Sequence, residues 1–184
     1  MDEPIQINPL KTSPSCRTFY IRSMKSVTEA AIRLANLAFE RLWRGDEIGQ
    51  DDAAAILNHL QNLIAQGAAL SRYFWPVGPA HRERGEFLRA EFNVTEDSSL
   101  KSRHLRNRPE HFDEKLDMYF SGTIAGVIVL QYVGPHFETG GLPRHFFRAY
   151  YTDRGIFEVL GNQVDIIPLV EEIHRIDEQL RHSS

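Results

Sequence analysis

The sequence contains one cysteine, Cys16, so no disulfide can form within a single chain. This cysteine usage is typical of a reducing compartment, and we expect a cytoplasmic location. The opening residues, MDEPIQINPLKTSPS, have neither a basic segment nor an apolar core. The sequence therefore predicts no secretory signal.

A long hydrophobic run is also missing. The most apolar segment, IAGVIVLQYVG at residues 124–134, is about half the roughly 20 residues that a membrane-spanning helix needs. It is rich in β-branched residues and flanked by glycine, which is typical of a buried strand. We therefore expect no membrane partner.

The chain has no excess of positive charge. Its 21 Lys and Arg residues stand against 25 Asp and Glu residues, which gives a net charge of −4. This balance argues against broad electrostatic binding to DNA or to an anionic membrane, although it leaves room for a local basic patch. With 42% hydrophobic residues, a chain of this length can build a core without disulfides or metals, and no cofactor is implied.

The spacing of apolar residues predicts a mainly α-helical protein. Met24, Ala31 and Ala38, for example, recur at a helical spacing. The expected helices cover about 18–44, 51–70, 79–93, 95–120 and 167–180, and the expected strands cover 126–133, 145–152 and 156–160. We expect an antiparallel up-and-down bundle of about four helices, with a small antiparallel β-sheet and a final helix at the C-terminus.

This pattern divides the chain into three parts. Residues 1–17 are rich in Pro, Ser and Thr and are expected to form a flexible N-terminal arm. Residues 18–122 are expected to form the helical bundle. Residues 123–184 are expected to form a small β-meander plus the C-terminal helix, packed on the bundle.

One short segment suggests a specific chemistry: LRNRPEHFDEKLD, residues 105–117. On a regular helix, Asn107 and His111 share a face, and Arg106 leans over it. Asn107 could set the tautomer of His111, whose other ring nitrogen could then transfer a proton near neutral pH. The guanidinium of Arg106 is suited to a phosphate. A proton-transfer group beside a phosphate clamp is what metal-free RNA cleavage requires.

The segment RNRPEH, from Arg106 to His111, resembles the Arg–polar–(several)–His signature of HEPN domains (higher eukaryotes and prokaryotes nucleotide-binding). In that family the signature lies on a late helix of an up-and-down bundle, and many members are metal-independent endoribonucleases of toxin or defence type. The resemblance implies that Arg106 and His111 are the catalytic pair and that Asn107 is the polar residue beside the Arg. It also implies RNA as the substrate, a homodimer, and an antitoxin or accessory protein as a further partner.

Basic residues surround this segment. Lys101, Arg103 and Arg108 could form a face that binds nucleic acid, with arginines of the expected third helix beside it. The alternative is that neighbouring acidic residues neutralise the cluster as interleaved surface pairs. The Arg–His spacing is also unspecific by itself, because Arg175 and His182 fit it as well.

A non-catalytic role stays open as the second interpretation. The protein would then be a helical binding or interaction protein, with Arg106 paired to Glu110 and His111 on the surface. Glu171 and His174 form a Glu-x-x-His pattern, but a di-metal bundle site needs two copies, so no metal site is predicted. The aromatic residues of the expected sheet could stack on bases, but core packing explains them more simply.

Overall fold

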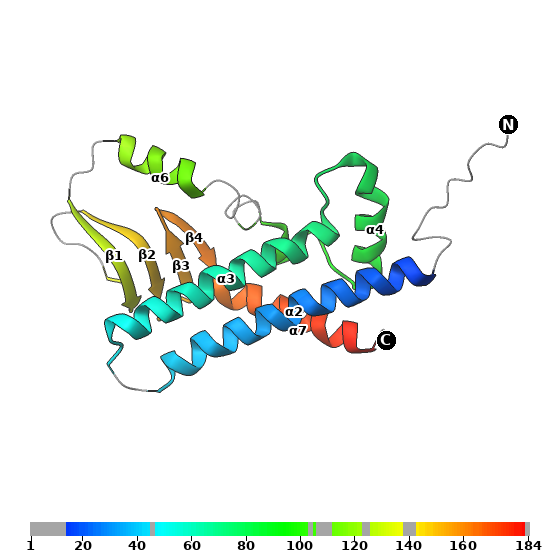
Figure 1. Cartoon of the computed structure of the whole chain (residues 1–184), viewed down its shortest axis with the longest axis horizontal. Coiled ribbons are helices and arrows are strands. Elements are labelled where there is room, and N and C mark those ends of the chain that lie inside the picture. Colours follow the sequence, from blue (N-terminus) through cyan, green and yellow to red (C-terminus); the bar gives the residue numbers. More distant parts are fainter. Residues whose placement is uncertain are drawn as a thin grey trace.

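The computed structural model describes most of the chain. The described residues are 14–44, 47–102, 105, 112–122, 126–137 and 143–182. They form a mainly helical protein with a small four-stranded sheet and a C-terminal helix (Figure 1). None of the described helices has both the length and the apolar character needed to cross a bilayer.

Along the described chain, helices come first, four strands follow, and one helix ends the order. In chain order they are α2 (Pro14–Leu42), α3 (Gln50–Phe74), η1 (Pro79–His81), α4 (Arg82–Glu91), η2 (Ser99–Lys101), α6 (Phe112–Ser121), β1 (Val127–Gly134), β2 (Arg144–Tyr151), β3 (Ile156–Val159), β4 (Asn162–Asp165) and α7 (Ile166–His182).

The two long helices α2 and α3 form an antiparallel pair that runs the length of the molecule (Figure 1). On α2 the buried face is a stripe that includes Met24, Ala31, Ala35 and Ala38, each at most 1% exposed. These side chains belong to one core cluster with larger buried side chains of α3, among them Ile56, Leu60 and Leu63. The helical stripe expected from Met24 to Ala38 is therefore confirmed.

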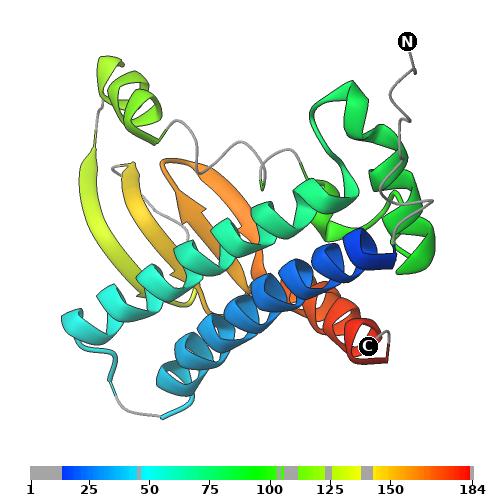
Figure 2. The same cartoon turned by 45° about the vertical axis from the view of Figure 1, so that its right-hand side comes forward.

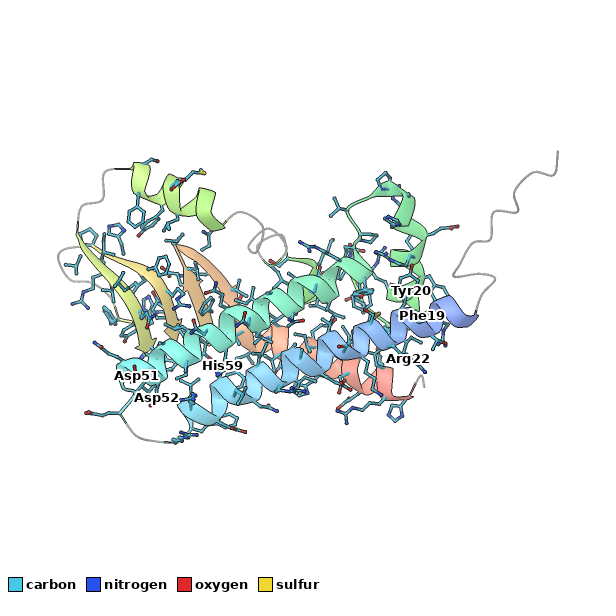
Figure 3. The ribbon with its side chains drawn as sticks, in the orientation of Figure 1. Phe19, Tyr20, Arg22, Asp51, Asp52 and His59 are labelled. Carbon is cyan, nitrogen blue, oxygen red and sulfur yellow. The ribbon has the colours of Figure 1, made fainter. Side chains whose placement is uncertain are left out.

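Both ends of this pair are tied by polar or aromatic contacts. At one end, Nη1 of Arg41 lies 2.5 Å from Oδ1 of Asp52, and Figure 3 shows Asp51 and Asp52 in the first turn of α3. Helix α3 begins after Gly49, and the carboxylates of Asp51 and Asp52 in its first turn interact favourably with the positive end of the helix dipole. At the other end, the ring of Tyr20 packs edge-on against Tyr73.

The structure does not contain the single fourth helix that was expected from about residue 95 to about Phe120. The hydroxyl of Ser98 accepts a hydrogen bond from the Leu100 amide and caps a short 3-10 turn, which ends at Lys101. Ser102 then has an extended backbone with ψ 128°, so helical geometry is interrupted there. Competing Ser caps explain the break, since such side chains bond the backbone in non-helical turns.

The sheet is mixed, not antiparallel as expected. Its order is β1-β2-β3-β4; β1 pairs with β2 in parallel, and the other neighbours are antiparallel. The connection over residues 135–143 is longer than the two to five residues of an ordinary hairpin loop. Extended, it reaches about 30 Å, enough to return the chain along β1. Glycine and proline in this loop mark a turn but not the direction of the next strand.

The last two strands form a tight hairpin that the sequence analysis missed. Leu160 and Gly161 both have positive φ, 49° and 73°, as a two-residue hairpin turn requires. A leucine rarely adopts this geometry, which hides the turn from the sequence. The preceding turn, between β2 and β3, was predicted and does place Gly155 at φ 66°.

Both faces of the sheet are covered by apolar contacts. Tyr150, Phe157 and Val159 belong to the main core with the helices, whereas Phe146 and Tyr151 join a second cluster on the opposite face. All five side chains are at most 8% exposed. Core packing, rather than base stacking, is therefore the role of these aromatic rings.

Helix α7 follows the sheet and packs across α2 (Figure 2). Ile173, Ile176 and Leu180 face the core, as their spacing predicted. A buried polar contact fixes this crossing: Oγ1 of Thr28 donates to Oδ1 of Asp177 at 3.2 Å. Nε of Arg181 donates to the other carboxylate oxygen at 2.8 Å, so the buried charge is paired.

Substitution of Gly85 tests the close contact between α4 and the end of α3. A Cβ on Gly85 would lie 2.6 Å from the carbonyl oxygen of Phe74 and from Cδ of Pro76. Alanine normally stabilises a helix interior by about 1 kcal/mol relative to glycine. Here the clash should outweigh that gain, so we expect Gly85→Ala to lower the free energy of unfolding by about 1–2 kcal/mol in urea titration.

Gly122→Ala is the matched control, because its Cβ would approach only the Tyr119 carbonyl oxygen, at 4.0 Å. A stabilised Gly85→Ala protein would show that α4 is packed less tightly against α3 than the structure indicates.

Candidate functional site

Most residues of the expected ribonuclease site lie outside the described residues. These are Arg103, Arg106, Asn107, Arg108 and His111. Their described neighbour Leu105 is buried, and its Cδ1 lies 3.5 Å from the position of a Cβ on Gly67 of α3. The chain is thus anchored to the core immediately before the Arg-Asn pair.

Lys101, the described member of the expected basic face, forms an ion pair. Its Nζ lies 2.5 Å from Oε2 of Glu96, and the hydrogen bond from Lys101 is the main reason why the pKa of Glu96 lies below its ordinary value. The Lys101 side chain is nevertheless 43% exposed, and an exposed pair of this kind contributes little energy. Lys101 can therefore exchange Glu96 for another anion at small cost.

The arginines of α4 are held by local acceptors. Arg89 contacts Glu96 at 3.7 Å and lies over the Trp75 ring at 5.7 Å, and Nη2 of Arg84 donates to the Arg72 carbonyl at 3.0 Å. Two of the three arginines of α4 are therefore engaged locally, Arg84 with a backbone carbonyl and Arg89 with a carboxylate and an aromatic ring.

Glu171 and His174 do not converge on one site. Glu171 lines a shallow polar depression beside Ser98, whereas His174 lines a different and larger groove. Within the described ranges, no three His, Cys, Asp or Glu side chains come close enough together to hold a metal ion. The neighbouring Glu172 binds Arg175 at 2.7 Å.

The groove that His174 lines is larger than the depression that Glu171 lines, and we call it the α2–α7 groove. It has a volume of about 890 Å³ and lies between the end of α2, the ends of β1 and β2, and the first half of α7. The residues that line it are Asn36, Phe39, Leu42, Trp43, Glu47, Ile48, Val133, Gly134, Pro135, Tyr150, Thr152, Ile167, Val170 and His174.

The floor of the groove is apolar. Leu42, Ile48, Val133 and Val170 are half-buried, and they pack against the main core. Tyr150 is 3% exposed, and burial raises the pKa of its hydroxyl. The floor therefore offers a dry surface on which an apolar group loses contact with water.

A stacked aromatic pair forms one wall. The rings of Phe39 and Trp43 lie 5.7 Å apart with an interplanar angle of 18°. The Trp43 amide still donates to the Phe39 carbonyl at 2.9 Å, so the last helical turn of α2 holds the pair together. Trp43 is 79% exposed, which is unusual for the largest apolar side chain and marks a surface able to bind another molecule.

Polar side chains occupy the rim. Asn36, Glu47, Thr152 and His174 are all exposed, and each can reach a ligand's polar end without being desolvated first. The Thr152 amide donates to the Gly134 carbonyl at 2.9 Å, so it continues the β1–β2 pairing and fixes this edge of the groove. An apolar floor with a few polar groups at the rim is the usual lining of a site that binds a small molecule.

Sequence analysis did not identify this groove. Phe39 and Trp43 lie four residues apart at a helix end, and this pair was the one local signal available. The other lining residues come from the 47–48 segment, the sheet and α7, and only the tertiary fold brings them together.

Comparisons of the chain with protein-family models, with curated proteins and with solved structures each gave no match.

Alkaline titration tests the burial of the tyrosines around the sheet. The pKa values of Tyr119, Tyr132, Tyr150 and Tyr151 lie above the ordinary value of about 10, in each case chiefly because of burial. Groups whose folded pKa is raised bind more protons in the folded state above pH 10, so stability falls as pH rises through that region. We expect the urea midpoint to be lower at pH 11 than at pH 9.

The same titration followed by phenolate absorbance should show these four residues ionising at a higher pH than free N-acetyltyrosinamide. Ionisation of all four at the pH of the free compound, in the folded protein, would contradict the buried placement.

Proposed function

We propose that this protein is a binding protein that holds a small, mainly apolar molecule in the α2–α7 groove. The observation that carries the proposal is the pairing of an apolar floor with the exposed Trp43 ring in a groove of about 890 Å³. Sites for small molecules typically occupy 300–1,000 Å³ and combine apolar walls with a few polar groups.

The chemistry of the lining defines the ligand class. An aromatic or branched aliphatic body could lie against Trp43 and Val170, where it would displace water from apolar surface. A hydrogen-bonding end group would point to the rim, toward His174, Asn36 or Glu47. This arrangement selects an amphipathic molecule over a highly charged one. The floor carries no charged side chain, and the rim carries one carboxylate, that of Glu47.

Fluorescence of 8-anilino-1-naphthalenesulfonate, an amphipathic aromatic probe with one sulfonate group, tests the groove. We expect saturable binding of one probe per chain, and Trp43→Ala should weaken it about tenfold or more, since truncation of a central aromatic contact commonly costs 2 kcal/mol or more. Trp43 is exposed, so its removal should leave the fold unchanged by circular dichroism.

Phe19→Ala is the matched control, because Phe19 is an equally exposed aromatic residue at the opposite end of α2, 70% exposed (Figure 3). Equal loss of probe binding in both variants, or none in Trp43→Ala, would refute binding in the groove.

A metal-independent endoribonuclease of HEPN type is the second candidate function. The sequence observation that favours it is the order Arg106, Asn107 and, four residues later, His111. In this proposal His111 transfers the proton of the attacking 2′-hydroxyl, Arg106 neutralises charge on the phosphate, and Asn107 orients the site. An up-and-down arrangement of the helices, a homodimeric site and an antitoxin or accessory partner belong to the same proposal.

Substitution of His111 distinguishes the ribonuclease from the binding protein. His111→Ala should abolish cleavage of single-stranded RNA in EDTA, by at least about a hundredfold, because general acid–base catalysis contributes 10²–10⁴-fold. The matched control is His182→Ala, since Arg175 and His182 have the same kind of spacing, and Arg175 is bonded to Glu172. Inert wild-type protein, or equal activity in His111→Ala, would eliminate the ribonuclease.

A further inference from the structure

One edge of the sheet has no neighbouring strand among the described residues. Strand β1 is the first strand in the sheet order, and Figures 1 and 2 both show its outer side facing away from the other described elements. The Val127 amide and the Gly134 carbonyl are bonded toward β2, to the Pro143 carbonyl and the Thr152 amide. The backbone groups on the other side, which we call the β1 edge, therefore lack a strand partner in the described structure.

Strand β1 is long for an edge strand, and its own sequence lacks the residues that usually protect a sheet edge. Its sequence, VIVLQYVG, spans eight residues and includes neither a charged residue nor proline. The opposite edge strand, β4, has four residues, NQVD, and ends in the acidic Asp165. Natural proteins normally shorten, charge or cover an edge strand, because an open one pairs with other chains. The contrast within one sheet indicates that β1 is covered in the functional protein.

Exposed apolar side chains continue this surface beyond the backbone. On β1, Val127 is 48%, Ile128 46% and Leu130 69% exposed. Met118 and Phe120 lie on α6, the helix that precedes β1, and are 74% and 53% exposed. Val127, Ile128 and Leu130 all lie on the edge strand itself, and exposed apolar side chains grouped in this way mark an interaction surface.

We infer that the β1 edge is a dimerisation surface and that its partner is the β1 edge of a second copy of this chain. Unpaired amide and carbonyl groups of a strand are matched by the same groups of another strand. A second β1 supplies them and brings no like charges together, since the strand is uncharged. An antiparallel pair of identical strands also satisfies the twofold symmetry of most homodimers.

The geometry of this dimer follows from the length of β1. Pairing two copies would join two four-stranded sheets into one continuous sheet, with the twofold axis near the strand centre. A twofold axis at Leu130 pairs residues 127–133 of the two copies and places the two Leu130 side chains directly opposite each other. The inference does not depend on either proposed function. No residue of β1 belongs to the ribonuclease segment, and of β1 only the last two residues, Val133 and Gly134, line the groove.

A charged substitution at Leu130 tests the dimer. Light scattering of the wild-type chain should give about twice the 21.2 kDa of one chain. Leu130→Lys should give a monomer over the same concentration range, with at least a hundredfold weaker association, because two ammonium groups would face each other at the axis. Val77→Lys is the matched control: Val77 is an exposed valine, 87% accessible, in the turn after α3, and this variant should remain dimeric.

Hydrogen exchange provides the second measurement and needs no variant. Amides of residues 127–134 should exchange more slowly at high than at low protein concentration, whereas those of β4 should not change. A monomeric wild-type protein would overturn the inference, and so would a dimer that Leu130→Lys leaves intact or one whose β1 amides exchange at a concentration-independent rate.

Discussion

The close packing of α2 against α3 is the interaction on which the rest of the structure depends. Ala31, Ala35 and Ala38 of α2 share one buried core with the large apolar side chains of α3, so the two helices form one long scaffold. The sheet and α7 then pack on this scaffold, and the buried Asp177 fixes where α7 crosses it. The sheet and α7 are thereby placed relative to α2, although they lie more than 80 residues after its end along the chain.

The α2–α7 groove is a product of this arrangement. Helix α2 extends beyond the region that α7 covers, and its last turn presents Phe39 and Trp43 beside the ends of β1 and β2. No single element supplies the floor, which helix, strand and loop residues share. Because Trp43 already stacks on Phe39, its ring is partly preorganised for a ligand, which lowers the entropic cost of binding.

The sequence predicted the long helices, most of the strands and the final helix, because apolar periodicity depends on local geometry. It did not predict that β1 and β2 pair in parallel, since glycine and proline in residues 135–143 indicate a turn without its direction. The β4 hairpin was missed because Leu160 adopts a positive φ that leucine seldom has. For the site, the Arg106–His111 motif was a local pattern that sequence could show, whereas the groove depends on contacts between distant segments that no spacing encodes.

Nuclear magnetic resonance of the two tryptophan indoles tests the central claim, binding in the groove, most directly. The chain has two tryptophans, Trp43 in the groove wall and Trp75 at the end of α3 beside Arg89. On titration with 8-anilino-1-naphthalenesulfonate, the account predicts a saturable shift of the Trp43 indole resonance and an unchanged Trp75 resonance. A shift confined to Trp75, or no shift of either indole while the probe binds elsewhere, would contradict it.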